Sequence, residues 1–445
     1  MKIVCLTPMG ELGGAERSLL DLMANLRVAR PDWPLILVAG GEGPLVTRAA
    51  ELGVRTIVLP FPTTVSRLGD AGAGGPAGRQ FTTGKLFGRM WAAIPSTLLY
   101  LSRFHRLIRS LAPDVVHSNG CKMHLLSTWA VPSHIPLIWH IHDYIGLRPM
   151  MSRLLRARSH RCAAAITNSY SVANDLRAVC GDKLGIFPIH NAIDVHYFSP
   201  QGPAMDLDKA SDMPPAPPGT VRVGLLATMA KWKGHEVFLR ALSLLAGGAP
   251  VRGYILGGPL YPSAGSQYRL DELRLVAARF GISHSVGFTG FIEDPAAAIR
   301  GLDVVVHAST QPEPFGLVVV EGMACGKAVI ASAAGGVAEI FDDGVDAMTH
   351  APGDAVELAA RIRQLAENPV LRARLGKAGR ATVVQHFDRT RLADRFIPLY
   401  ETIYGGSLPE SSKLARFSGL SRSIEREQQQ PSQADTVALQ LRPNL

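Results

Sequence analysis

The 445-residue sequence contains no uninterrupted apolar run of the roughly 18 residues that a membrane-spanning helix needs. Its first ten residues, MKIVCLTPMG, hold a short apolar stretch before Pro8, too short for the apolar core of a secretory signal. The five cysteines are scattered without a CxxC pair, so neither a disulfide framework nor a zinc site is expected. These absences predict a protein of the reducing cytoplasm.

Several sequence motifs are also missing. The sequence has no GxGxxG dinucleotide fingerprint, no GxxxxGK[ST] phosphate loop and no HExxH metal motif. Its basic stretches lack the signatures of RRM, KH and helix-turn-helix modules, so no nucleic-acid partner is expected. We likewise expect neither a bound metal nor a resident cofactor.

The composition, 47% hydrophobic and 19% charged, is that of a globular chain with two or three domains at roughly 100–200 residues each. The net charge of +9 lies in the first 200 residues, which carry 21 Lys and Arg but 12 Asp and Glu. Residues 71–113 and 144–174 contain no acidic residue at all. A one-sided basic surface attracts anionic lipid, nucleic acid or a phosphate-bearing substrate. Unevenly distributed solubility charge is the alternative.

Short apolar runs alternate with helical segments in two series separated by a proline-rich stretch. This alternation predicts the α/β class, with two Rossmann-like, doubly wound parallel-sheet domains facing across a cleft. Strands are expected near residues 2–6, 35–39, 54–59, 114–117, 136–142, 163–167, 185–189, 221–227, 251–257, 285–289, 302–306 and 327–331. The predicted parts are a first domain (1–198), a linker (199–220), a second domain (221–386), a crossover helix (387–406) and a disordered tail (407–445).

In such sheets, ligands bind beyond the carboxyl ends of the strands, so the loops there are the first place to look for function. In the first half, Gly13 and Gly14 open a helix and form either an anion seat or a plain tight turn. His142 ends an apolar strand, where it can bond a substrate or transfer a proton, whereas His140 fits a core histidine. Asn168 fits a helix cap, and Asn191 lies where it can shape the floor of the cleft.

The second half holds a basic loop and a pair of carboxylates. Lys231 and Lys233 follow the first strand of the second series, as an anion seat or a solvated basic loop. Glu313 and Glu321 are eight residues apart, about two helical turns. Two carboxylates at a cleft can do acid–base work or accept hydrogen bonds from the hydroxyls of ribose and a hexose. A structural ion pair is the alternative for Glu321.

The order and spacing of these motifs resemble glycosyltransferase family 4, whose members have the GT-B fold. The resemblance covers residues 1 to about 405 and is densest at 221–345. It rests on GGAE (13–16), His-Asp (142–143), TNS (167–169), HNAID (190–194), KG (233–234), E-x7-E (313–321) and AGG-x-x-E (334–339).

This resemblance implies that the second domain binds a nucleotide sugar. Glu321 would accept from the ribose hydroxyls, and Glu313 from the transferred sugar. Lys233 would neutralise the diphosphate, helped by the backbone amides of Gly13 and Gly14. His142 would lie near the reacting sugar, and His142, Glu313 and Lys233 form the implied catalytic set.

The remaining implied donor-binding residues are Asn191, Thr228, Lys231, Phe315, Gly316 and Leu317. Thr228 is a departure, because family members usually carry an Arg five residues before the Lys of KG. Lys231 is the expected source of the missing charge. Family members transfer with retention of configuration and without a DxD-bound metal.

The expected function is therefore retaining transfer of a sugar from a UDP- or GDP-sugar to a glycan or lipid-linked acceptor in cell-surface polysaccharide or glycolipid synthesis. Residues 85–109 mix basic and large apolar side chains, and either rest on an anionic inner membrane or form an ordinary basic helix on the sheet. The alternatives are a nucleotide-sugar epimerase, a sugar phosphorylase, and a binding protein without catalysis.

Overall fold

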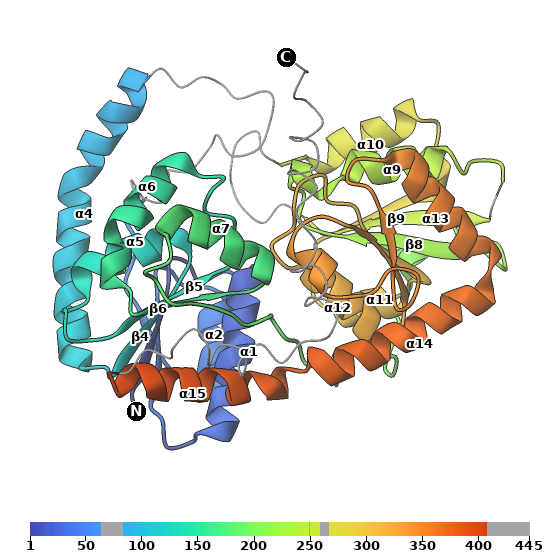
Figure 1. Ribbon diagram of the computed structural model, residues 1–445. Coiled ribbons are helices and arrows are strands. Elements are labelled where there is room, and N and C mark those ends of the chain that lie inside the picture. The colour runs from blue at the N-terminus through green and yellow to red at the C-terminus, as the bar shows by residue number, and fades with distance from the viewer. Residues whose placement is uncertain (64–82, 249, 259–266, 407–445) are drawn as a thin grey trace, which may run out of the picture. The chain divides into compact units, whose positions relative to one another are not determined.

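The computed structural model describes residues 1–63, 83–248, 250–258 and 267–406. Within them, two wholly parallel sheets are each covered by helices (Figure 1). The prediction of two doubly wound α/β domains is confirmed, and we refer to them as the first and second lobes. Residues 69–78, whose glycine-rich composition predicts a loop, and the expected tail at 407–445 lie outside the described residues.

The first sheet has the strand order β3-β2-β1-β4-β5-β6-β7. Its strands are β1 (Ile3–Thr7), β2 (Leu35–Ala39), β3 (Arg55–Val58), β4 (Val115–Asn119), β5 (Leu137–Ile141), β6 (Ala164–Thr167) and β7 (Ile186–Pro188). Its helices are α1 (Gly14–Ala29), α2 (Pro44–Glu51), α4 (Thr83–Leu111), α5 (Cys121–Ala130), α6 (Pro149–Arg158), the 3-10 turn η1 (Ser159–Arg161) and α7 (Tyr170–Cys180).

The second sheet has the order β10-β9-β8-β11-β12-β13. Its strands are β8 (Val221–Leu226), β9 (Val251–Leu256), β10 (Val286–Gly290), β11 (Val304–His307), β12 (Ala328–Ser332) and β13 (Met348–His350). Its helices are α8 (Leu207–Ala210), α9 (His235–Ser243), α10 (Leu270–Arg279), α11 (Pro295–Arg300), α12 (Leu317–Ala324), α13 (Ala355–Glu367) and α14 (Pro369–His386). Short 3-10 turns are η2 (Lys231–Lys233), η3 (Ser283–Ser285) and η4 (Gly336–Glu339).

Strand order reverses between β1 and β4 in the first sheet and between β8 and β11 in the second. In open parallel sheets, the connections on either side of such a point leave in opposite directions and open a crevice at the carboxyl ends of the strands. The loops that follow β1, β4, β8 and β11 are therefore the places where this fold positions ligand-binding residues.

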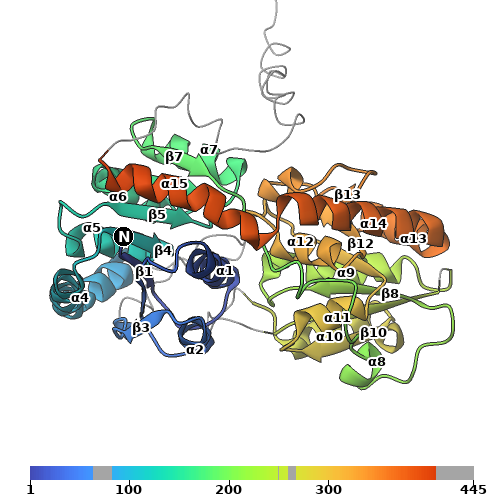
Figure 2. The same cartoon turned by 90° about the horizontal axis from the view of Figure 1, so that it is seen from below.

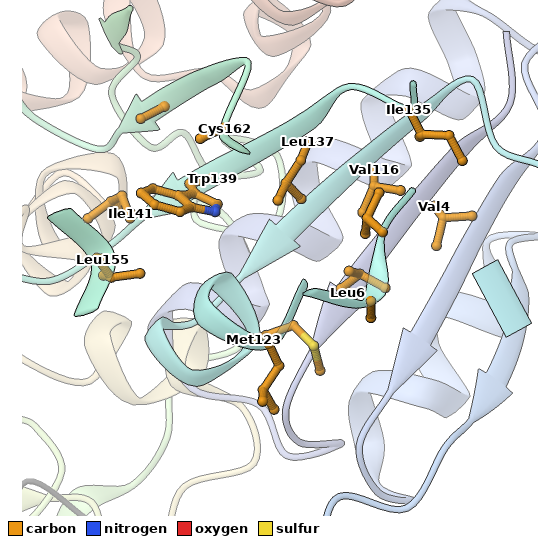
Figure 3. Close-up of a cluster of buried hydrophobic side chains, with 14 of the residues drawn as sticks. Val4, Leu6, Val116, Met123, Ile135, Leu137, Trp139, Ile141, Leu155 and Cys162 are labelled. Carbon is orange, nitrogen blue, oxygen red and sulfur yellow. The ribbon is translucent and has the colours of Figure 1, made fainter. Parts of the chain in front are cut away.

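Alternation along the strands divides each lobe into two packed faces. In the first lobe, α4, α5, α6 and α7 cover one face, where Val4, Leu6, Trp139 and Ile141 form part of the core (Figure 3). The opposite face receives α15 (Leu392–Tyr404), whose Phe396 and Tyr400 contact buried histidines of β4 and β5. The second lobe has equivalent cores on its two faces.

The end of the described chain passes from one lobe to the other. Helix α14 packs on α12 and β12 of the second lobe, whereas α15 packs on α1 of the first (Figures 1 and 2). Between them, the turn η5 (Arg389–Arg391) places Arg389 3.1 Å from Asp21 and 2.6 Å from Asp194. Within residues 387–406, expected as a crossover helix, Phe387 still packs in the second-lobe core, whereas α15 packs on the first lobe.

The stretch expected as a linker is partly anchored to the second lobe. It contains α8, whose Asp208 is buried and accepts hydrogen bonds from Arg252 (2.7 Å) and Tyr254 (2.6 Å) of β9. Burial alone would raise the pKa of Asp208, but these hydrogen bonds hold it well below its usual range. The backbone around α8 is thus fixed to β9.

In the described ranges, no helix is both long and apolar enough to cross a bilayer.

Candidate functional site

A lysine and a glutamate meet at the carboxyl ends of β8 and β11. Lys233 Nζ lies 2.7 Å from Glu313 Oε2, and Ser309 Oγ donates to the same oxygen at 2.9 Å. His307 Nε2 is 3.2 Å from that oxygen. Glu313 is only 8% exposed, so its charge depends on these partners rather than on water.

The partners of Glu313 decide its protonation. Burial by itself would raise the pKa of the Glu313 carboxyl, but the Lys233 charge and the His307 hydrogen bond outweigh it and hold the pKa well below its usual range. Glu313 is therefore an anion at neutral pH. An anionic, oriented carboxylate can accept hydrogen bonds from sugar hydroxyls but cannot donate a proton.

Local backbone geometry explains why Lys233 points there. Gly234 has φ of +76° and is the N-cap of α9, a conformation that favours glycine. A side chain there would also collide with the Ala308 carbonyl. The Thr310 amide donates to the Trp232 carbonyl at 2.7 Å, and Lys233 Nζ lies 4.1 Å from the Trp232 ring centre. The loops after β8 and β11 are thus fastened together.

Glu321 lies in α12 and is 6% exposed. Its Oε1 is 3.7 Å from the Arg17 guanidinium, which belongs to α1 of the first lobe. Burial raises the pKa of the Glu321 carboxyl, and Asp21 adds to this, whereas Arg17 opposes it. A buried carboxylate with a single long ionic contact retains lone pairs for a ligand hydroxyl.

The first turns of α1 and α12 lie next to each other. Gly13 is the N-cap of α1 and Gly316, with φ of +101°, is the N-cap of α12. A Cβ placed on Gly14 would lie 3.5 Å from Leu317 Cδ1. A helix N-terminus has amides without partners inside the helix and a dipole that favours an anion. At the start of α1, the amides of Gly13 and Glu16 already bond the Glu16 carboxyl. Phe315 has its ring buried in the second-lobe core, so only its backbone can face a ligand.

His142 follows β5, and its Nε2 lies 2.7 Å from Asn119 Oδ1 at the end of β4. Because an amide oxygen only accepts, the ring donates from Nε2 and carries a bare lone pair on Nδ1. This Nδ1 has no partner among the described residues. Burial lowers the pKa of His142 to about 3, so the ring is neutral at physiological pH.

His142 packs against a row of buried histidines. The rings of His140 and His142 are 4.1 Å apart, so the two side chains lie on the same side of the sheet. His140 Nδ1 lies 3.1 Å from His117 Nε2, and His117 Nδ1 lies 2.8 Å from the Tyr400 hydroxyl of α15. Burial depresses the pKa of His140 and His117, so this row is uncharged and structural.

Two groups of contacts hold the lobes together near Glu313. The Tyr144 hydroxyl donates to the Glu313 carbonyl at 3.4 Å and receives the Gly336 amide at 3.3 Å. The Glu339 carboxylate accepts from the backbone amides of Tyr170 (2.9 Å) and Ser171 (2.7 Å), at the N-terminus of α7. Its Oε2 also lies 2.7 Å from His190 Nε2.

Other predicted residues lie apart from this cluster. The exposed Lys231 has its Nζ 5.5 Å from the centre of the Tyr268 ring. Thr228 is half-buried in the loop after β8. Asn191 lines a small cavity of about 10 Å³ with Ser18, His140 and Phe396 of the first lobe. The expectation that Asn168 caps the next helix is wrong, because Ser169 Oγ is the group that accepts from Val172 N.

Four residues at the site were not singled out from the sequence: Arg17, Asn119, Ser309 and Tyr144. Asn119 had a usable signal, since the buried strand Val115–Asn119 turns polar over its last three residues. Ser309 also follows a strand end. Arg17 and Tyr144 had no comparable signal.

Among the described residues, no group of three or more His, Cys, Asp or Glu is arranged to hold a metal ion.

Comparison with known proteins adds two family matches. Residues 12–197 match the Glycosyltransferase Family 4 profile, and residues 212–382 match that of the Glycosyl transferases group 1. The two matches thus cover the first and second lobes respectively.

Two relatives differ in how much of their length is matched. The chain is 29% identical over 203 residues to the lipopolysaccharide core biosynthesis glycosyltransferase LpsE of Rhizobium meliloti, covering 45% of this chain and 55% of that protein. The chain therefore spans about half the length of that relative. It is 26% identical over 320 residues to alpha-maltose-1-phosphate synthase of Mycobacterium tuberculosis, covering 66% of this chain and 80% of the synthase.

The fold resembles that of Anabaena Alr3699/HepE, solved in complex with UDP and glucose. The TM-score is 0.71 at 24% identity, over 90% of this chain and 100% of HepE. At this identity, the likeness bears on the fold alone, which is GT-B as expected.

Proposed function

The chain belongs to glycosyltransferase family 4, and we propose that it transfers a sugar from a nucleotide-sugar donor to a glycan or lipid-linked acceptor, with retention of configuration. The observation that carries the proposal is the ion pair of Lys233 with the buried Glu313 at the strand reversal of the second sheet. Glu321 and two neighbouring helix N-termini lie beside the loops that hold it. A relative named for lipopolysaccharide core biosynthesis supports a place in cell-surface polysaccharide or glycolipid synthesis.

Each group has a role that matches its chemistry. The Lys233 ammonium and the amides at the starts of α1 and α12 stabilise the departing diphosphate, where negative charge develops. Glu313 accepts from hydroxyls of the transferred sugar, and Glu321 accepts from the ribose. His142 offers Nδ1 to a donor-sugar hydroxyl. This charge arrangement takes the place of a metal ion in the proposed reaction.

In the transfer step, the bond between the anomeric carbon and the β-phosphate oxygen breaks. The acceptor oxygen bonds to the same face of that carbon, and its proton passes to the departing β-phosphate oxygen. The diphosphate thus serves as the base, which agrees with a Glu313 that is held as an anion by Lys233. The nucleoside diphosphate then leaves.

The first test is a thermal-shift screen against UDP-, GDP- and ADP-sugars, because a ligand that binds only the native state raises the melting temperature. Turnover with the donor selected in this way is then measured in the presence of EDTA. The anomeric configuration of the product is assigned by NMR. Retention without added metal is expected. An inverted product, or turnover that EDTA abolishes, contradicts the proposed mechanism.

The same assay separates the alternatives. An epimerase converts the nucleotide sugar without an acceptor, and a phosphorylase requires inorganic phosphate. A protein that only binds the donor shows the thermal shift but forms no product in any of these conditions.

We also propose that the first lobe docks peripherally on the anionic inner face of the cell membrane. Helix α6 supports this, because it exposes Met150 and Leu154 beside Arg153 and Arg156, in a stretch without acidic residues. Apolar side chains flanked by arginines suit the boundary between headgroups and acyl chains. On α4, Leu98 and Leu99 are also exposed.

Flotation with vesicles of phosphatidylglycerol and phosphatidylcholine tests this docking. Binding is expected to fall when salt is raised and when Arg153 and Arg156 are both changed to Gln. Equal flotation with purely zwitterionic vesicles, or none with anionic ones, would exclude it.

A further inference from the structure

The cations that follow β8 leave the donor diphosphate short of positive charge. Lys233 already shares its charge with Glu313 at 2.7 Å. Lys231 is exposed and lies over the Tyr268 ring, and position 228 holds an uncharged Thr. A nucleoside diphosphate carries at least two negative charges, so a second cation is needed from another part of the chain.

Arg17 is placed to supply that cation. It lies in the first turn of α1, three residues after Gly14, and its side chain is 38% exposed. Its Nη1 is 3.7 Å from Glu321 Oε1, which is longer than an N–H···O hydrogen bond. The guanidinium donors are therefore not used up by Glu321.

The surroundings of Arg17 fit a ligand that has both a ribose and a phosphate. Glu321 faces it from α12, and the first turns of α1 and α12 lie side by side next to it. Asp21, one turn further along α1, is held by Arg389 at 3.1 Å. The acceptor oxygens of Glu321 and the donor groups of Arg17 thus point into the same region.

We propose that Arg17, from the first lobe, binds the phosphate of the donor that is nearest the ribose. This inference rests on the proposed function. With the ribose on Glu321, the attached 5′-phosphate lies within reach of the adjacent guanidinium. The planar guanidinium can hold two phosphate oxygens at once. The donor diphosphate is then bound between a cation of each lobe, Arg17 and Lys233.

Calorimetric titration of the full chain tests the assignment. The probes are the nucleoside diphosphate that binds best among UDP, GDP and ADP, and its nucleoside without phosphate. Arg17→Gln is expected to weaken the diphosphate roughly ten- to hundredfold while changing nucleoside affinity less than about twofold. Arg17→Lys should recover part of the lost diphosphate affinity, because the lysine ammonium keeps the positive charge but cannot hold two phosphate oxygens at once as the guanidinium does.

Two variants serve as matched controls. Arg27→Gln removes the same charge from the last turn of α1 and should leave both affinities unchanged. Lys231→Gln removes the cation that the family resemblance implies for the diphosphate, and the proposal requires that it weaken diphosphate binding less than Arg17→Gln does. Thermal melting of each variant shows whether it is folded at the temperature of the titration.

The proposal is overturned if Arg17→Gln keeps the diphosphate affinity of the native protein, or if Lys231→Gln produces the loss instead. It is also overturned if Arg17→Gln weakens diphosphate and nucleoside equally, since Arg17 would then act only by restraining Glu321. If the native protein binds none of the three diphosphates, the proposed function itself fails, and this inference with it.

Discussion

Lys233 Nζ lies 2.7 Å from Glu313 Oε2, although the two residues are 80 positions apart in the sequence. The pair forms because β8 and β11 are neighbours in the sheet, so the loops after them start side by side. The same contact keeps Glu313 ionised and fixes the direction of Lys233. Much of the proposed donor chemistry depends on this one contact.

Changing Lys233 to Ala should reduce transfer about a hundredfold or more, as removing one preorganised donor to a developing charge does. It should also destabilise the second lobe by about 1–3 kcal/mol, because Glu313 keeps only its Ser309 and His307 partners. Turnover and thermal melting measure the two effects. The double variant Lys233→Ala/Glu313→Gln should be more stable than Lys233→Ala alone; equal or lower stability would mean that the pair is not coupled.

Substitutions of Glu313 and Glu321 should impair different properties of the protein, turnover in the first case and ligand affinity in the second. Glu313→Gln should lower kcat roughly ten- to hundredfold, because Glu313 acts on the transferred sugar, while the affinity for the nucleoside without phosphate should change little. Glu321→Gln should weaken nucleoside and nucleoside diphosphate alike by about tenfold, because one charged hydrogen bond to the ribose is lost. Turnover and calorimetry on the same preparations separate the two, and the reverse pattern would refute both assignments.

The strands were predictable because buried parallel strands are continuous apolar runs. The run Ala328–Ser332 is wholly buried and was expected within one residue at each end. Strand β13, Met348–His350, was not expected, because three residues ending in a histidine make no apolar run. A strand this short depends on its neighbour β12 for its hydrogen bonds.

The site was predictable residue by residue but not as a set of contacts. Lys233, Glu313 and His142 were found because charged or polar side chains followed apolar strands. Their partners were not, because the sequence does not state which strands are neighbours. From the sequence, Arg17 would be interpreted as a solvent-facing residue of α1. Only the packing of α1 beside α12 brings it close to Glu321.

Asn119→Asp should give the protein a new pH dependence. In the native protein, burial keeps the pKa of His142 at about 3, so its Nδ1 accepts hydrogen bonds throughout the physiological range. A carboxylate at position 119 favours the charged ring and raises that pKa. Below the raised pKa, Nδ1 is protonated and can no longer accept.

Activity of Asn119→Asp should therefore rise with pH across the raised pKa of His142, whereas the native protein has no acid limb from His142 in the physiological range. The measurement is kcat/KM against pH for both proteins. Asn119→Ala is the control, since it should lower activity by a similar factor at every pH. Superimposable profiles for the native protein and Asn119→Asp would rule out a role for Asn119 in setting the His142 lone pair.

Glu16 should make stability depend on pH. It is 4% exposed in the first turn of α1, and burial raises its pKa to about 7, helped by Asp143 and opposed by the backbone amides of Glu16 and Gly13. Between its unfolded value of 4.5 and about 7, the folded state holds a proton that the unfolded chain has released. The folded state binds more protons in that window, so stability falls as pH rises through it and levels off above.

Glu16→Gln cannot titrate and should lose this slope. Its stability relative to the native protein should grow from pH 4.5 to 7, by up to about 3 kcal/mol, since each unit of pKa difference corresponds to about 1.4 kcal/mol. Urea unfolding at pH 5, 6, 7 and 8 measures the difference. The exposed Glu11, changed to Gln, is the control, because it removes one negative charge from the loop just before α1. If the stability of Glu16→Gln and that of the native protein instead changed in parallel with pH, the buried carboxyl would not titrate in this range. Its burial would then be compensated by hydrogen bonds stronger than those from the two backbone amides.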